Sequence, residues 1–127
     1  TRFPLIWELS DAAEGRGLVS DGTIRRKVDK HGQPLIDHNV FLSDAVQGVM
    51  LCLQNDQAIG ETFNFPAPKA HSSDEYAEVL QAKFGYQVED SARFAHGWEI
   101  DYSKAASMLG YAPHYDLLEL IKGTYGL

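Results

Sequence analysis

The stretch Asn39-Val40-Phe41-Leu42-Ser43-Asp44-Ala45-Val46-Gln47 decides how the rest of the chain is interpreted. Its first part, residues 39–42, is extended and apolar, which indicates a short strand. Asp44 stands where a helix needs an N-cap, and Gln47 three residues later completes the pattern of a capping box. Apolar residues then recur at helical spacing, namely Val46, Val49, Met50 and Leu53. We therefore expect a strand that runs directly into a helix over residues 44–55.

Two residues inside this predicted helix carry further information. Gly48 costs about 1 kcal/mol relative to alanine in a helix, so we interpret it as a point of close approach to a neighbouring segment. Cys52 is the only cysteine of the chain, which excludes an intrachain disulfide. A cysteine on an apolar helix is typically a small buried hydrophobe, and it makes a poor nucleophile there.

Length and charge limit the classes of function. A chain of 127 residues can bury the core of a single domain, so we expect one domain over residues 1–127. The net charge of −7 argues against nucleic acid as the main partner. No apolar run approaches the ~20 residues of a membrane span, so no membrane partner is expected. A cytoplasmic location fits the single cysteine and the lack of a secretory signal.

The segment before the central stretch begins without methionine and is apolar from Phe3 to Trp7, from which we expect a piece of a longer protein. Residues 10–22 are polar and rich in glycine, which predicts a loop. The fragment Gly15-Arg16-Gly17 lacks the strand, helix and third glycine that a phosphate-binding loop requires, so we reject that interpretation.

Two runs, residues 23–29 and 33–37, flank Lys30-His31-Gly32 and predict a hairpin with the glycine at positive φ. The basic residues of this hairpin form a cluster: Arg25, Arg26, Lys27, Lys30 and His31. Such a cluster is most often a solvated strand face. The alternative is an arm whose positive charges face the phosphates of a ligand. The sequence leaves both interpretations open.

The second half of the chain contains one predicted strand and three predicted helices. Residues 60–65 alternate like a strand and end at Pro66. A helix begins at Ser72 with Glu75 in a capping box and ends at Gly85, and an extended segment follows at 86–88. Two short helices follow, one capped by Asp101 and ending at Leu109, the other beginning at Asp116 with a stripe of Leu117, Leu120, Ile121 and Tyr125.

No self-contained catalytic set is present in the sequence. The five histidines, His31, His38, His71, His96 and His114, lack the tight spacing of a metal site. No serine lies in a Gly-x-Ser-x-Gly elbow. The residues alone therefore predict an α/β domain without its own catalytic machinery.

Four motifs in register carry a resemblance to a known family. They are Val40-Phe41-Leu42-Ser43-Asp44-Ala45-Val46, Gly60-Glu61-Thr62-Phe63-Asn64-Phe65, the helix 72–85 with Tyr86 after it, and Asp101-Tyr102-Ser103-Lys104-Ala105 with Leu109-Gly110-Tyr111-Ala112-Pro113. Their order and spacing resemble the C-terminal, substrate-binding part of the NAD-dependent epimerase/dehydratase family, the extended short-chain dehydrogenases that act on nucleotide sugars. The resemblance implies an α/β fold of about four helices and two to four short strands.

The resemblance also implies what this chain lacks. The family's glycine-rich dinucleotide fingerprint and its Tyr-x-x-x-Lys pair, the tyrosine of which is the acid/base, are both missing from the sequence. We therefore expect no cofactor on this fragment and no turnover by it alone. In the parent protein, NAD or NADP would bind to the N-terminal Rossmann half. An epimerase, a dehydratase and a reductase all remain open.

The substrate residues implied by the resemblance depart from the family pattern. Asp37 and His38 stand where many members carry an arginine that holds the substrate diphosphate. Arg93 is the candidate for a second family arginine, although its usual Pro-Gly-Asp neighbours are absent. Guanidinium groups suit a diphosphate, so we predict that Arg25 or Arg26 compensates. The predicted substrate-binding residues are Arg25, Arg26, Arg93 and His38.

Several alternatives remain at this stage. Asn64 is interpreted as an asparagine that bonds a neighbouring loop. Phe94, Trp98 and Tyr102 either pack in the core or line a sugar pocket. A non-catalytic binding module on the same scaffold is the second hypothesis for function, and the lost arginine favours it. Open strand edges and an exposed apolar face predict self-association of the fragment.

Overall fold

The computed structural model describes residues 5–92 and 97–127. Its backbone contacts divide the chain into two compact units. Unit 1 comprises residues 1–8, 38–70 and 100–117, and unit 2 comprises residues 9–37, 71–99 and 118–127. Each unit is described separately below.

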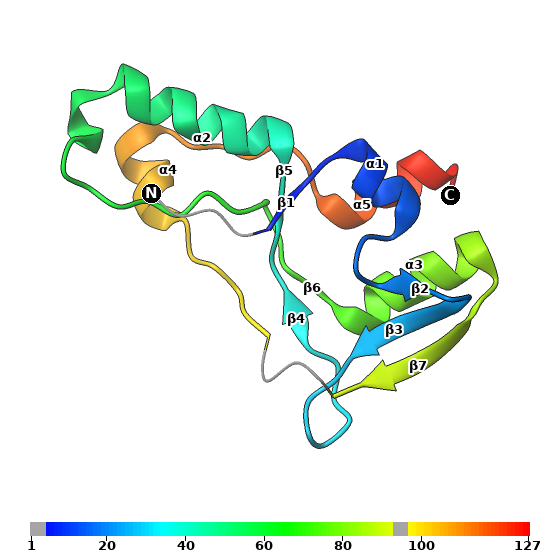
Figure 1. The fold of residues 1–127 in the computed structure, drawn as a ribbon. Helices are drawn as coiled ribbons and strands as arrows, with labels where there is room; N and C mark the ends of the chain where they lie inside the picture. Colours follow the sequence, from blue (N-terminus) through cyan, green and yellow to red (C-terminus); the bar gives the residue numbers. More distant parts are fainter. Residues whose placement is uncertain (1–4, 93–96) are drawn as a thin grey trace. The chain divides into compact units, whose positions relative to one another are not determined.

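Unit 1 is built on the central stretch. Strand β1 (Ile6–Trp7) pairs in parallel with β5 (Val40–Phe41), and β5 runs directly into helix α2 (Leu42–Gln54), as Figure 1 shows. The 3₁₀ turn η1 (Asp56–Ala58) and helix α4 (Ser103–Leu109) complete its elements. The expected strand-to-helix transition is confirmed, and the helix begins two residues earlier than predicted.

The core of unit 1 lies under α2 and α4. It consists of Phe63, Phe65, Ala105, Leu109 and Tyr111, with Cys52 and Tyr102 among the partly buried residues packed against it. A Cβ atom built on Gly48 would lie 2.5 Å from the ring of Phe65. The close approach predicted for Gly48 is therefore confirmed, because the Phe65 ring occupies the space that a side chain would need.

Residues 60–65 do not form the predicted strand. The backbone there has only a bridge residue at Asn64. The side chains are nevertheless buried at every second position as predicted, since Phe63 and Phe65 are 1% and 0% exposed. Burial of the two aromatic rings, rather than a ladder of backbone bonds, explains the apolar period of two.

Unit 2 contains a three-stranded sheet covered by a helix. Strand β3 (Thr23–Lys27) pairs antiparallel with β2 (Val19–Ser20) and in parallel with β7 (Gln87–Ser91). Helix α3 (Ser73–Phe84) packs on β3 and precedes β7 in the chain, as Figure 1 shows. A second pair joins β4 (Ile36–Asp37) to β6 (His71–Ser72), antiparallel.

Helix α3 has the ends that the sequence predicts. Ser72 is its N-cap, and the carboxylate of Glu75 accepts the Ser72 N–H at 2.8 Å in a capping box. Gly85 ends the helix at φ +70°, a conformation that glycine adopts without strain. The extended segment predicted at residues 86–88 is confirmed as the start of β7.

The loop predicted for residues 10–22 is wrong in part. Helix α1 (Leu9–Glu14) and strand β2 occupy that segment. Ala12 is 1% exposed, and its carbonyl accepts the Tyr125 hydroxyl from helix α5 (Leu117–Tyr125). Tertiary packing of a short helix that is marginal by itself explains the difference.

The hairpin predicted around residues 30–32 forms only near its turn. Val28 and Pro34 make an isolated antiparallel bridge, and Leu35 N–H bonds the Lys27 carbonyl at 2.9 Å. The returning arm then leaves as β4 to pair with β6. Since β3 is already flanked by β2 and β7, no free edge remains for a longer hairpin.

The predicted α/β class is confirmed, with more short elements than expected. The described residues form five α-helices, and seven strands where two to four were predicted. Helix α4 begins at Ser103, with Tyr102 rather than the predicted Asp101 at the N-cap position. Asp101 still accepts the Ser103 N–H at 2.8 Å, so its carboxylate serves the helix start from one position further out. This backbone bond, together with a hydrogen bond from the Ser103 side chain, lowers the pKa of Asp101.

Candidate functional site

The predicted cationic site begins with two adjacent arginines on β3 in unit 2. Side chains alternate along a strand, so Arg25 and Arg26 lie on opposite faces of the sheet. The Arg26 guanidinium donates to the Gly32 carbonyl at 3.3 Å and lies 3.5 Å from the Asp90 carboxylate. Among the residues that the structure describes, Arg25 has no ion pair of its side chain. Arg25 therefore differs from Arg26, whose guanidinium already contacts Gly32 and Asp90.

Lys27 is neutralised within unit 2. Its ammonium donates to the Asp37 carboxylate at 3.1 Å, and Asp37 is 7% exposed. Asp37 occupies a position at which the resemblance implies an arginine. The structure thus places an internal ion pair where a free positive charge was implied by the family pattern.

The turn that carries the remaining basic residues is held by Asp29. Its carboxylate accepts the N–H of Gln33 at 3.0 Å and of His31 at 2.8 Å. These two backbone bonds lower the pKa of Asp29, because they stabilise its charged form. Lys30 and His31 are exposed at the tip, next to Gly32, which has the predicted positive φ.

His38 lies in unit 1 and is 2% exposed. Its Nε2 lies 2.7 Å from the Ala67 carbonyl, and the Ile100 N–H lies 2.9 Å from its Nδ1. This geometry requires Nε2–H as the donor and Nδ1 as the acceptor, which is the neutral tautomer. The ring therefore ties residue 38 to two backbone segments, 29 and 62 positions away.

The predicted site residues do not all fall in one described unit. Arg25 and Arg26 are neighbours in unit 2, and His38 belongs to unit 1. Arg93 and Phe94 lie outside the described residues. Trp98 is 45% exposed, whereas Tyr102 packs edge-on against Tyr111 at 5.7 Å between ring centroids. Of the two predicted alternatives for Tyr102, the structure thus supports packing in the core over lining a sugar pocket.

Two polar residues of α2 have roles that the sequence did not reveal. The Asp44 carboxylate is 1% exposed and accepts the N–H groups of His114 and Tyr115, each at 2.9 Å. The Gln47 amide donates to the Ala112 carbonyl at 3.0 Å and accepts the Ala112 N–H at 2.9 Å. The predicted capping box of Asp44 and Gln47 is therefore wrong. Phe41 is the N-cap, and both side chains bind the loop 112–115 instead.

Asn64 and Tyr111 add two further anchors in unit 1. The Asn64 amide donates to the Asp101 carbonyl at 3.3 Å, which confirms the loop-bonding interpretation. The Tyr111 hydroxyl donates to the Pro66 carbonyl at 2.6 Å. Burial raises the pKa of Tyr111 well above its ordinary value, and the nearby Asp44 carboxylate adds to the effect. The Tyr111 hydroxyl is accordingly neutral at physiological pH. It donates a structural hydrogen bond and does not serve as an acid or a base.

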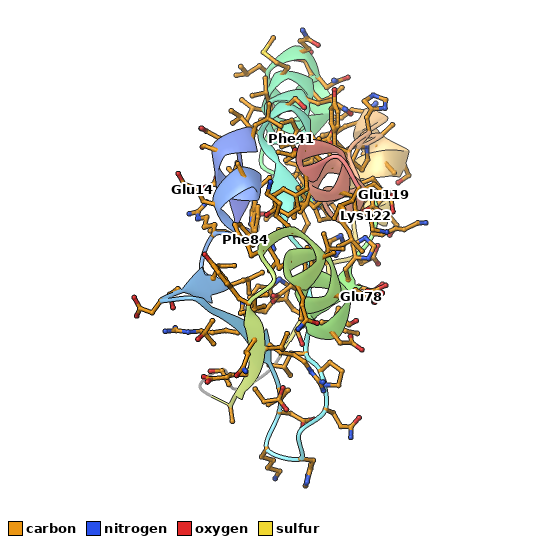
Figure 2. The ribbon with its side chains drawn as sticks, turned by 90° about the vertical axis from the view of Figure 1, so that its right-hand side faces the viewer. Glu14, Phe41, Glu78, Phe84, Glu119 and Lys122 are labelled. Atoms are coloured by element: carbon orange, nitrogen blue, oxygen red, sulfur yellow. The ribbon has the colours of Figure 1, made fainter. Side chains whose placement is uncertain are left out.

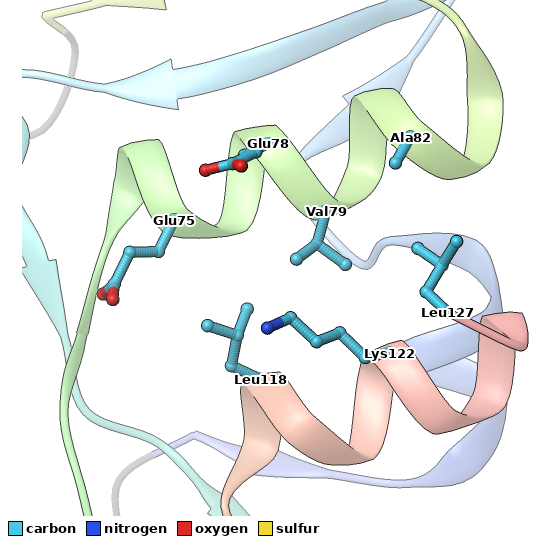
Figure 3. Close-up of a pocket in the computed structure, with 7 residues that line it drawn as sticks. All are labelled: Glu75, Glu78, Val79, Ala82, Leu118, Lys122 and Leu127. Atoms are coloured by element: carbon cyan, nitrogen blue, oxygen red, sulfur yellow. The ribbon is translucent and has the colours of Figure 1, made fainter.

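A pocket in unit 2 opens between α3 and α5. Its volume is about 530 Å³, and Figure 3 shows its lining: Glu75, Glu78, Val79, Ala82, Leu118, Lys122 and Leu127. Val79 and Leu118 are each 6% exposed and form an apolar floor, and Lys122 lies 3.3 Å from Glu119. Figure 2 places Glu78 on α3, and Glu119 and Lys122 on α5. The sequence predicted both helices but contained no signal that their flanks would enclose a pocket.

Other kinds of site are not found in the part of the chain that is described. Within residues 5–92 and 97–127, no three or more His, Cys, Asp or Glu side chains gather as metal ligands would. None of the helices there has the length and hydrophobicity to cross a membrane.

Comparison with known proteins identifies solved structures that share this fold. No family model matches the sequence, and no curated protein matches it. Solved structures do match. A short-chain dehydrogenase/reductase superfamily protein from Agrobacterium tumefaciens, solved with bound NAD, aligns at a TM-score of 0.83 and 13% identity. The alignment covers 98% of this chain and 48% of that protein.

Two epimerases match in the same way. The UDP-glucuronic acid 4-epimerase from Bacillus cereus, solved with UDP-glucuronic acid and NAD, gives a TM-score of 0.69 at 16% identity. The UDP-glucose 4-epimerase from Thermotoga maritima, solved with UDP-glucose, gives 0.67 at 20% identity. Each alignment covers 98% of this chain and 43% of the epimerase. The expected resemblance is confirmed as a matter of fold: the chain has the fold of the NAD-dependent epimerases and related short-chain dehydrogenase/reductase superfamily proteins, over less than half of their length.

Proposed function

We propose that this chain is the substrate-side portion of an NAD(P)-dependent enzyme that acts on a nucleotide sugar, as an epimerase, dehydratase or reductase. The observation that carries the proposal is the match of nearly the whole chain to epimerases that were solved with UDP-sugars. A UDP-sugar presents a diphosphate, for which the basic strand β3 supplies guanidinium groups.

Arg25 is the first candidate for contact with the diphosphate. Its side chain has no ion pair among the described residues, whereas the Arg26 guanidinium already contacts Gly32 and Asp90. A guanidinium that is not already paired loses no internal contact when it binds a phosphate. Arg26 would have to give up its contact with Asp90 in order to bind the ligand. Arg93 is the second candidate for contact with the diphosphate, on the basis of its position before the Asp101–Ala105 motif.

His38 is assigned a positioning role in this proposal. Both of its ring nitrogens are engaged with backbone groups, so contact with the sugar would require one of these bonds to break. Its imidazole fixes the residues that follow β4, next to the position of the family arginine.

The hydride transfer itself belongs to residues outside this sequence. NAD or NADP would supply it from a dinucleotide-binding half, because the glycine-rich turn and the Tyr-x-x-x-Lys pair are missing here. We accordingly expect ligand binding, without turnover, from the chain alone.

Calorimetric titration of the 127-residue chain with UDP-glucose tests the proposal. Arg25→Ala should weaken binding about 10-fold or more, since a charge-assisted bond to phosphate is worth roughly 1.5–3 kcal/mol. Arg16→Ala is the matched control, because Arg16 is an exposed arginine of the same unit that pairs with Asp11 at 3.3 Å. Unchanged affinity in Arg25→Ala, Arg26→Ala and Arg93→Ala alike would reject the assigned contacts.

A non-catalytic binding module is the second candidate function, favoured by the partly buried Lys27–Asp37 ion pair. If Asp37 occupies the diphosphate position, Asp37→Arg should increase the affinity for UDP-glucose, and Asp37→Asn should not. A chain that binds no UDP-glucose, even with Asp37→Arg, supports the module that has lost its ligand.

A further inference from the structure

Lys27, the last residue of β3, is held as a partly buried cation. Its ammonium donates to the Asp37 carboxylate at 3.1 Å, and the two side chains are 19% and 9% exposed. The Arg16–Asp11 pair of the same unit is more open, at 41% and 25%. The cost of taking two charges out of water can exceed the gain from their attraction, so a partly buried pair is weak evidence for stability. Stability alone therefore does not explain why the chain shields this lysine from water.

The backbone of Lys27 is fixed from several directions within unit 2. Its carbonyl accepts the Ser73 hydroxyl at 2.5 Å and the Leu35 N–H at 2.9 Å. The parallel ladder pairs Lys27 with Ser91 of β7. The base of the lysine side chain is thus fixed, and Asp37 holds the ammonium at its other end. A cation that is already ordered loses less conformational entropy when it binds an anion.

Lys27 shares one face of β3 with Arg25. Helix α3 packs on β3, and Ile24 of that strand is fully buried, so Ile24 and Arg26 face the helix. Because side chains alternate, Arg25 and Lys27 lie on the other face, with Cα atoms roughly 7 Å apart along the strand. Glu89 of β7 stands opposite Arg25, so Lys27 is the cation of this face without a carboxylate as its cross-strand neighbour in the sheet.

The contact with Asp37 is compatible with a contact between Lys27 and a phosphate group. An ammonium carries three N–H donors, and the bond to Asp37 uses one of them. In protein kinases, a lysine on a strand is paired with a glutamate while it contacts the phosphates of the nucleotide. A carboxylate beside a lysine can therefore position the cation for a phosphate.

We infer that Lys27 is a phosphate-binding residue of the proposed substrate site, acting with Arg25 on the same face of β3 and positioned by Asp37. The inference rests on the proposed function and adds a contact to the substrate-binding residues predicted from the sequence. Asp37 stands at a position where the resemblance implies an arginine, and Lys27 brings a positive charge to it from β3. The aspartate at position 37 thus holds a cation from a neighbouring strand and does not leave the site without one.

A neutral pair in place of the ion pair tests Lys27 without leaving a shielded charge unpaired. Lys27→Met combined with Asp37→Asn keeps the net charge of the chain, and removal of both charges of a buried pair is often neutral for stability. Calorimetric titration with UDP-glucose should show a dissociation constant raised about 10-fold or more. Pyrophosphate should lose affinity in parallel, because the contact is to phosphate. Arg16→Met combined with Asp11→Asn is the matched control, since it neutralises an ion pair of the same unit and should leave both affinities unchanged.

Two single variants separate contact from positioning, with circular dichroism to verify that each is folded. Lys27→Arg keeps a cation beside Asp37 and should bind UDP-glucose within about 3-fold of the wild type. Asp37→Asn should weaken binding about 3-fold or more, and it should have no further effect once Lys27 is replaced by methionine, because Asp37 acts through Lys27. Equal losses in both backgrounds, or a gain of affinity in Asp37→Asn, would overturn the positioning role.

The failure of this inference is distinguishable from the failure of the proposed function. Unchanged affinity of the neutral pair, beside a wild type that binds UDP-glucose, would overturn the inference and leave the proposed function standing. A loss of the same size in the Arg16–Asp11 control, or a loss for UDP-glucose without one for pyrophosphate, would also overturn it. A wild-type chain that binds no UDP-glucose would overturn the proposed function, and the assignment of Lys27 with it.

Discussion

Asp44 Oδ2 accepts the backbone N–H of Tyr115 at 2.9 Å, although the two residues are 71 positions apart in the chain. The other oxygen of the same carboxylate accepts the N–H of His114, and the Phe41 and Tyr115 rings lie 5.1 Å apart. Gln47, one turn further along α2, holds Ala112 by both polar atoms of its amide. Helix α2 thus fixes the loop that leads to α5, and a residue that looked like a helix cap is a buried tertiary anchor.

Replacement of this anchor should be costly. Asp44→Ala leaves two backbone N–H groups of the loop without acceptors, and we expect the free energy of unfolding to fall by about 2–4 kcal/mol. Urea denaturation followed by circular dichroism measures the change. Ser43→Ala is the control, since Ser43 is the exposed neighbour on the same helix turn and should change stability by less than about 0.5 kcal/mol. If Asp44→Ala also lowered the free energy of unfolding by less than about 0.5 kcal/mol, Asp44 would not be an anchor.

Gly48 is expected to tolerate no side chain. Gly48→Ala would place a methyl group 2.5 Å from the Phe65 ring, which the packed core of unit 1 can accept only by moving. We expect a loss of about 1–3 kcal/mol from overpacking, despite the better helix propensity of alanine. Thermal unfolding of the variant provides the measurement.

The control for Gly48→Ala lies in α5. A Cβ atom on Gly123 would have no neighbour within 4 Å, so Gly123→Ala should be neutral or stabilising by about 0.5–1 kcal/mol. Equal effects of the two substitutions would show that helix propensity, and not contact with Phe65, governs Gly48.

Glu75 makes the stability of unit 2 depend on pH. The backbone N–H of Ser72 is the main cause that lowers the pKa of Glu75 from its ordinary value of 4.5, and His71 adds to it. A lowered pKa in the folded state contributes stability above the unfolded value, and that contribution is lost as the pH falls through the folded value. Glu75→Gln should therefore be less stable than the wild type at pH 6 and equally stable at pH 2–3.

Denaturation of the two proteins across that pH range tests the role of Glu75. Glu78→Gln is the control, because Glu78 lies on the same helix, one turn on, outside the capping box. A gap between wild type and Glu75→Gln that persists unchanged to pH 2 would contradict the assignment, since it would not arise from the carboxylate.

Tyr111 should matter through its hydroxyl as well as its ring. Tyr111→Phe removes the bond to the Pro66 carbonyl and leaves that buried acceptor without this donor, at an expected cost of about 1–3 kcal/mol. The ring contact with Phe65, at 4.9 Å between centroids, is preserved by phenylalanine. Chemical denaturation of Tyr111→Phe beside Tyr86→Phe gives the comparison, since Tyr86 is 38% exposed. Equal stability of the two variants would assign Tyr111 a packing role alone.

The sequence predicted the longer helices well, because their signals are local. The Ser72–Glu75 capping box and the Gly85 stop define α3 by bonds between residues near one another in the chain. The apolar alternation of residues 60–65 was equally visible, yet it marked two buried rings rather than a strand. Periodicity reports which side chains are buried and does not report whether the backbone finds a partner.

Less of the candidate site could be predicted from the sequence. The basic cluster was evident, but only the structure showed that Lys27 pairs with Asp37, and Arg26 with Asp90. Ion pairs between elements depend on strand register, and the parallel pairing of β3 with β7 sets Arg26 opposite Asp90. The pocket between α3 and α5 likewise arises from the packing of two helices that are distant in the chain.

The sequence by itself determined the strand-to-helix transition after Asn39, the ends of α3 and the resemblance to a family fold, since each of these follows from local spacing and composition. Tertiary structure alone decided what Asp44 and Gln47 do. Both sit where a capping box would be expected, and a carboxylate in the first turn can serve either its own helix or a distant loop. Burial settled the choice: at 1% exposure Asp44 must have its charge satisfied, and the N–H groups of His114 and Tyr115 are the donors that the fold brings to it.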